Sequence, residues 1–97
     1  MKLHQKGYLL VELHRSGVLW DDDIVSRTLR EFGHTGSYRD KSVRVALEEL
    51  AAAGLVSRVE SKLEQRDGRK MVSFQYALTE FGRTRMRDTG LLLEAGS

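Results

Sequence analysis

The chain has 97 residues, of which 40% are hydrophobic and 31% charged, and its 16 Lys and Arg exceed its 14 Asp and Glu by two. This length predicts one domain over residues 1–97 whose modest core is too small for a deep catalytic pocket. The absence of cysteine excludes disulfides, thiol catalysis and cysteine metal sites. No apolar run reaches the length of a membrane helix and no signal-peptide pattern opens the chain, so a cytoplasmic location is the default expectation.

The small net charge conceals an uneven distribution. Residues 56–88 carry eight basic and five acidic side chains, whereas residues 21–37 carry two basic and four acidic ones. Local patches rather than net charge decide whether a nucleic-acid backbone is attracted. The basic second half of the chain is therefore the more informative feature.

Residues 2–16 are predicted to form a helix that ends at Gly17. Its apolar side chains spread around most of the helix circumference, whereas a helix with one broad solvent face has a narrower apolar stripe. Two interpretations stay open: the helix is sandwiched inside the domain, or it also contacts a partner chain. The apolar residues concerned are Leu3, Tyr8, Leu9, Leu10, Val11 and Leu13.

A second helix is predicted over residues 22–32, after an apolar connector at residues 18–20. The run Asp21, Asp22 and Asp23 is typical of an N-cap followed by acids that complement the helix dipole. This interpretation is favoured over a divalent-cation site. Gly33 is predicted to end the helix, and its buried stripe is predicted to consist of Ile24, Val25, Leu29 and Phe32.

A third helix is predicted over residues 38–53, after a tight loop formed by His34, Thr35 and Gly36. Ser37 is its expected N-cap, with Asp40 as a partner similar to that of a capping box. Two helices joined by a short glycine-containing turn, the second basic at its start, form a helix-turn-helix pattern. The expected core face of this third helix consists of Val43, Ala46, Leu47 and Leu50.

Beyond Gly54 the hydrophobic period changes from 3.6 to 2, which predicts strands over residues 55–61 and 71–78. Residues 62–70 are mostly polar, and Asp67-Gly68 is a strong hairpin-turn signal. The second strand is predicted to turn Val72, Phe74, Tyr76 and Leu78 to one face.

A last helix is predicted over residues 80–88. Thr79 is its expected N-cap, and Phe81 is its expected contact with the core.

The order helix, helix, helix, strand, basic hairpin, strand, helix is that of a winged helix-turn-helix domain. The run SVRVALEELAAAGLV at residues 42–56, followed by the basic hairpin, resembles bacterial winged-helix transcriptional regulators. The likeness is greatest to the PadR-like and MarR-like groups, whose wing strand leads into a Tyr-x-Leu-Thr-x-x-Gly-Arg motif. In this sequence the motif consists of Tyr76, Leu78, Thr79, Gly82 and Arg83.

The resemblance covers residues 5–88 and implies an α+β fold with three helices, a β-hairpin wing and a short C-terminal helix. It implies sequence-specific binding of double-stranded DNA by a transcriptional regulator. Two features depart from those groups. Gly36-Ser-Tyr-Arg-Asp40 replaces their Gly-x-Leu-Tyr stretch, and their long C-terminal dimerisation helices have no counterpart, so their mode of oligomerisation is not carried over.

The third helix offers side chains suited to a DNA groove. Lys and Arg suit phosphates or guanine edges, Ser suits several bases, and a small apolar side chain suits the thymine methyl group. Val45 is informative because a β-branched apolar residue has no local reason to lie on a face that only contacts solvent. The alternative is that Val45 is simply exposed, since isolated exposed apolar residues are normal. The candidate contacts on this helix are Tyr38, Arg39, Lys41, Ser42, Arg44 and Val45, with Arg44 at the border of the outward face.

The hairpin supplies a second candidate contact. Arg66, Arg69 and Lys70 flank its predicted turn, where an arginine can enter a minor groove or hold phosphates. The alternative is a charged loop that only keeps the protein soluble. Together the two elements predict a third helix in the major groove and a wing on the adjacent backbone or minor groove.

No catalytic, metal or cofactor site is expected. His4, His14 and His34 lack the spacing of a helical metal pair, and no triad or phosphate-binding loop is recognisable. Tyr8, Trp20 and Tyr76 could line a small effector pocket, but a place in the core is the favoured interpretation.

One DNA-binding module buries too little surface for tight specific binding, so a homodimer is expected. Its candidate interface is the first helix together with Leu91, Leu92 and Leu93. The alternative function is a winged-helix protein-interaction module without DNA binding. That alternative is favoured by the modest net charge and by Glu48 and Glu49, which would repel phosphates that they faced.

Overall fold

The computed structural model describes residues 4–33 and 37–91. The predicted loop at residues 34–36 and the candidate interface residues Leu92 and Leu93 lie outside this range. No helix within it is long and apolar enough to cross a membrane.

The described chain contains four helices and three strands, and all four predicted helices are confirmed to within a few residues. The helices are α1 (Gln5–Ser16), α2 (Asp21–Phe32), α3 (Ser37–Ala52) and α4 (Glu80–Thr89), and the strands are β1 (Val18–Trp20), β2 (Val56–Arg66) and β3 (Arg69–Leu78).

The strand β1 corrects the sequence interpretation, which treated residues 18–20 as a connector. The sheet has the order β1-β3-β2 and is antiparallel, with Leu19 of β1 opposite Tyr76 and Trp20 opposite Gln75. A three-residue segment shows no readable alternation by itself. It is a strand because the edge of β3 offers backbone groups for it to pair with.

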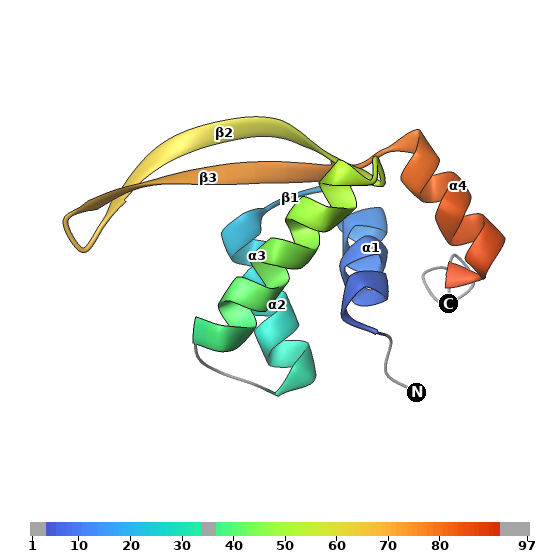
Figure 1. Ribbon diagram of the computed structural model, residues 1–97, viewed down its shortest axis with the longest axis horizontal. Helices are drawn as coiled ribbons and strands as arrows, with labels where there is room; N and C mark the ends of the chain where they lie inside the picture. Colours follow the sequence, from blue (N-terminus) through green and yellow to red (C-terminus); the bar gives the residue numbers. More distant parts are fainter. Residues whose placement is uncertain (1–3, 34–36, 92–97) are drawn as a thin grey trace.

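From Phe74 toward the hairpin turn, β3 no longer pairs with β1 and the sheet has only the two strands β2 and β3. This part of the β2–β3 hairpin projects past the helices as the wing (Figure 1). After a register shift between Arg58 and Glu60, the pairing of β2 with β3 is continuous from Glu60 opposite Gln75 to Arg66 opposite Arg69. Except for the two turn residues, the polar stretch 62–70 therefore belongs to the ladder, and the predicted strands were too short. The strands of a hairpin are held together by paired backbone groups and do not need a buried face. The apolar alternation therefore stops before the strands do.

The wing turns at Asp67 and Gly68, whose φ angles are 51° and 75°. Two successive left-handed residues characterise the two-residue turn that matches the twist of a hairpin, and Asp-Gly is a favoured sequence for it. The predicted turn is confirmed.

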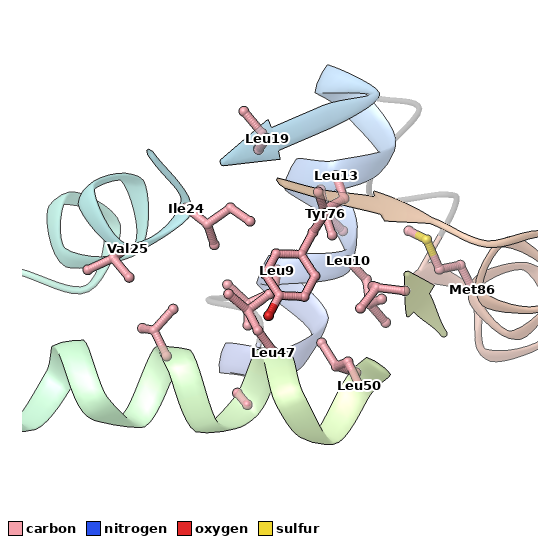
Figure 2. Close-up of a cluster of buried hydrophobic side chains, with 14 residues drawn as sticks. Leu9, Leu10, Leu13, Leu19, Ile24, Val25, Leu47, Leu50, Tyr76 and Met86 are labelled. Atoms are coloured by element: carbon pink, nitrogen blue, oxygen red, sulfur yellow. The ribbon is translucent and has the colours of Figure 1, made fainter. Parts of the chain in front are cut away.

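The core lies where α1, α3 and the sheet meet (Figure 2). Side chains from α1, α2 and α3 point toward one another there, and Met86 closes the cluster from α4. All five apolar residues of α1 from Tyr8 to Leu13 are buried within this one chain. Of the two interpretations of the first helix, the sandwiched one is confirmed. The predicted core face of α3 is also confirmed, since Val43, Ala46, Leu47 and Leu50 are all buried.

The start of α2 differs from the expected aspartate cap. Trp20 occupies the N-cap position without a side-chain cap, and the buried Asp21 is the first helical residue. On the core side of α2, Ile24 and Val25 are buried as predicted, whereas Leu29 and Phe32 are only half-buried. Thr28 is fully buried on the same face. Its hydroxyl can be buried there because it donates a hydrogen bond to the carbonyl of Ile24 at 2.8 Å.

The helix α4 confirms one prediction and corrects another. The Thr79 hydroxyl accepts a hydrogen bond from the Gly82 amide at 2.9 Å, as expected for an N-cap. Phe81, however, is 53% exposed, and Gly82 and Met86 are the residues that α4 buries. The predicted core contact of Phe81 is therefore wrong, because the helix turns its glycine rather than its phenylalanine to the domain.

Candidate nucleic-acid interface

The helix α3 packs on the domain with one face and exposes the opposite one. Lys41 and Val45 lie one helical turn apart on that exposed side, and Val45 is 52% exposed. Their predicted outward orientation is confirmed. Tyr38 and Arg39 belong to the first turn of α3, but their side chains lie outside the described part of the chain, as does that of the expected cap Ser37.

Ser42 does not share this orientation. It is half-buried, and the Gln5 side-chain amide of α1 donates to its carbonyl and to its hydroxyl, each at 3.3 Å. The expectation that Ser42 faces outward is therefore wrong, since a contact with α1 holds it. A helical wheel places residues relative to their own helix only and could not anticipate that contact.

Arg44 lies inside a cluster of three carboxylates. Its guanidinium nitrogens lie 2.6 Å from Asp40, 2.8 Å from Asp22 and 3.3 Å from Asp21. Partial burial by itself lowers the pKa of Arg44, but hydrogen bonds to Asp22 and Asp40 outweigh it and raise the pKa overall. Asp40, the residue expected to support the helix cap, accepts a hydrogen bond from Arg44 one turn along α3.

The acids in the second half of α3 have cationic neighbours from other elements. Glu49 lies 3.2 Å from the Lys6 amine of α1, and Glu48 lies 3.9 Å from Arg58 of β2. Both pairs are exposed and contribute little stability. They do offset the negative charge that would otherwise oppose a phosphate backbone at this end of α3.

The tip of the wing carries the second group of candidate contacts. Arg69 and Lys70 are exposed, and the register places Arg66 opposite Arg69. The side chain of Arg66 is not among those described. The hairpin thus brings three basic positions together at the end farthest from the helices (Figure 1).

The wing also exposes two apolar side chains, one from each of its strands. Leu63 is 72% exposed and Val72, directly opposite it, is 49% exposed. Residues directly opposite in an antiparallel pair share one face, so these two form a small apolar patch. The alternation in β3 pointed to Val72 but could not show that the helices stop short of it.

The three aromatic residues considered for an effector pocket have separate surroundings. The Tyr8 hydroxyl donates to the carbonyl of Arg27. The Lys62 amine lies 4.2 Å from the centre of the Trp20 ring, and Tyr76 accepts a hydrogen bond from Arg58. Within the described residues, no group of three or more His, Cys, Asp or Glu could hold a metal ion.

A helix-turn-helix with a basic hairpin wing beside its second helix defines the winged helix-turn-helix class, and the fold expected from the sequence is confirmed. PadR of Bacillus subtilis, solved in complex with operator DNA, is similar in structure, with a TM-score of 0.56 and 23% identity. The match covers 84% of this chain and 44% of the PadR chain, so this chain spans less than half of the PadR length. No protein-family model and no curated protein matches the sequence.

Proposed function

We propose that the chain is a cytoplasmic transcriptional regulator that binds double-stranded DNA sequence-specifically, with α3 in the major groove. The observation that carries this proposal is the pair Lys41 and Val45, which lie one helical turn apart on the exposed face of α3. An α-helix fits the major groove, where Lys reads guanine or phosphate and an apolar side chain contacts the thymine methyl group. Tyr38 and Arg39 extend the same end of α3.

The wing supplies the second contact in this proposal. Arg69 and Lys70 at its exposed tip, together with Arg66, reach the phosphate backbone or the minor groove beside the helix. The solved complex of PadR with operator DNA supports a DNA role for this fold. Fold alone does not determine function, so the exposed side chains carry the argument.

A homodimer completes the proposal, because one such module buries too little surface on DNA for high affinity. The buried apolar side chains of α1 belong to the core of this chain and are not free for a partner. Exposed residues of α1 and the region of the half-buried Leu91 remain as the interface. Sedimentation equilibrium tests this point, and a monomer at concentrations that saturate DNA would contradict it.

Fluorescence anisotropy of a labelled random-sequence duplex tests the DNA role directly. We expect binding that weakens with salt by a log–log slope of about −0.9 for each phosphate contacted. Selection from a randomised pool would then yield a preferred sequence. No binding at low salt would contradict the proposal.

A protein-interaction module is the second candidate, and the exposed pair Leu63 and Val72 is the observation that favours it. An apolar pair on a projecting hairpin suits a protein surface as well as a DNA groove. Absence of DNA binding at low salt, with a partner recovered by pull-down and lost in Leu63→Ser, would support this second candidate.

A further inference from the structure

The base of the wing is held by the first residue of α2. The strand β1 ends at Trp20 opposite Gln75, and from Phe74 outward β3 has lost this neighbour. The next residue, Asp21, accepts a hydrogen bond from the Phe74 amide through Oδ2 at 3.2 Å. A side-chain carboxylate thus continues the ladder by one position and satisfies an edge N–H group that would otherwise lack a strand partner.

Asp22, the next residue of α2, also binds β3, in this case through the side chain of Ser73. The Ser73 hydroxyl donates to Asp22 Oδ2 at 3.4 Å, so that two successive residues of α2 hold two successive residues of β3. Ser73 is buried, and only 7% of the Asp21 side chain is exposed. A carboxylate this well buried requires a compensating charge.

Arg44 provides that charge from α3. Its guanidinium contacts Asp21 and Asp22 through its two terminal nitrogens and Asp40 through Nε. All three guanidinium nitrogens therefore face carboxylates of the protein itself. The resulting network joins α3, the start of α2 and the point at which the wing leaves the three-stranded sheet.

We propose that Arg44 is a positioning residue that fixes the orientation of α3 relative to the wing and does not itself contact DNA. This inference rests on the proposed DNA-binding function and revises the assignment of Arg44 as a contact. Because the planar guanidinium fork matches several carboxylates at once, an arginine suits this junction better than a lysine.

Neutralising a carboxylate partner of Arg44 changes DNA affinity in opposite directions for the two possible roles of Arg44, positioning residue or DNA contact. Asp22→Asn removes the negative charge of one partner of Arg44; if Arg44 bound phosphate, this weaker pairing would make it more available and strengthen DNA binding. Under the positioning role the same change weakens binding by about two- to thirtyfold, the range for residues that couple sites without contacting the ligand. The matched control is Asp23→Asn, which removes the same charge from an exposed side chain in the same turn and leaves Arg44 in place.

The salt dependence gives a second readout. Arg44→Lys keeps the positive charge but not the fork, and it weakens DNA binding with an unchanged log–log salt slope. Arg44→Met does the same under the positioning role, whereas loss of a phosphate contact lowers the slope by about 0.9. A lowered slope for Arg44→Met, or tighter binding of Asp22→Asn than of Asp23→Asn, overturns the proposal. Circular dichroism establishes that each variant is folded.

A measurement without DNA separates this inference from the proposed function. Hydrogen exchange of the Phe74 amide in the free protein should accelerate in Arg44→Lys and Asp22→Asn but not in Asp23→Asn. If the wild type binds no duplex, the proposed function fails while the exchange result still decides whether the network holds the wing. Unchanged Phe74 exchange in Arg44→Lys overturns the network.

Discussion

At Gly82 the first turn of α4 lies against the backbone that follows α3. A Cβ atom there would collide with the carbonyl oxygen of Leu55 and would lie 3.0 Å from Leu78 Cδ1. The collision is with backbone, which cannot move aside as a flexible side chain does. This contact gives a physical reason for the glycine in the Tyr-x-Leu-Thr-x-x-Gly-Arg motif, which sequence comparison presents only as a pattern.

Gly82→Ala should therefore lower the free energy of unfolding by about 1–3 kcal/mol, as overpacking does. A glycine in an open helix behaves oppositely, since replacement by alanine there is favourable. Urea denaturation followed by circular dichroism measures the change. Thr84→Ala, on the exposed side of α4, is the control and should stay within about 0.5 kcal/mol of the wild type. A stabilised Gly82→Ala would show that the close approach is not present.

Tyr8 makes stability depend on pH in the alkaline range. Burial, followed by the negative charge of Glu12, raises the pKa of Tyr8 from 10.0 to about 12. Between these values the unfolded chain releases the phenolic proton and the folded chain keeps it. The free energy of unfolding consequently falls as the pH rises from 10 to about 12.

Denaturation midpoints measured across this pH range test the effect, with Tyr8→Phe as the comparison. The contribution of Tyr8 is the difference between the two pH profiles, which should widen above pH 10. Parallel profiles would mean that the Tyr8 phenol titrates alike in both states.

On the scale of elements, the N-terminus of α4 is attached to the turn that follows α3. The Thr79 hydroxyl accepts from the Gly82 amide and lies 2.6 Å from the carbonyl oxygen of Gly54 and 3.0 Å from that of Leu55. The same hydroxyl thus caps α4 and contacts the turn that follows α3. Met86, which this helix buries in the core, depends on that placement.

Thr79→Ala should cost about 0.5–2 kcal/mol of unfolding free energy, the range for an N-cap. Thr79→Ser keeps the hydroxyl and should retain most of the stability. The two variants are compared by thermal unfolding. Equal losses in both would assign the effect to the Thr79 methyl group rather than to its hydrogen bonds.

In the molecule as a whole, the proposed DNA contacts come from two parts of the chain that are far apart in the sequence. Lys41 lies on α3, whereas Arg69 and Lys70 lie at the tip of the wing. The helix α4 with its arginines lies at the other end of the molecule from that tip (Figure 1). The proposed interface therefore predicts that equal changes of charge have unequal effects on DNA binding.

Lys41→Glu should weaken DNA binding and lower the log–log salt slope by about one, because a phosphate contact is lost. Lys41 is exposed, so the unfolding temperature should change little. The matched control is Arg85→Glu on the exposed side of α4, which changes the net charge equally. Equal losses in the two variants would indicate a nonspecific charge effect and would remove α3 from the interface.

The features that depend on neighbouring residues could be predicted from the sequence. The 3.6-residue period located the helices and the buried face of α3, Asp67-Gly68 located the turn, and Thr79 located the cap of α4. Each follows from interactions within a few positions along the chain. The exposure of Lys41, Val45, Arg69 and Lys70 was predictable for the same reason, while their contact with DNA stays a prediction.

Features that depend on residues far apart in the chain could be read only from the packing of the elements. The connector at residues 18–20 is a strand because β3 lies beside it, and Ser42 is half-buried against α1, where the Gln5 side chain donates to its hydroxyl. Arg44 and Asp40 are four residues apart, a spacing that could have suggested their pair. The other two partners of Arg44, Asp21 and Asp22, however, lie more than 20 positions away in the sequence. Helical periodicity gives the direction of a side chain from its own axis, and only the packing of elements determines what it meets there.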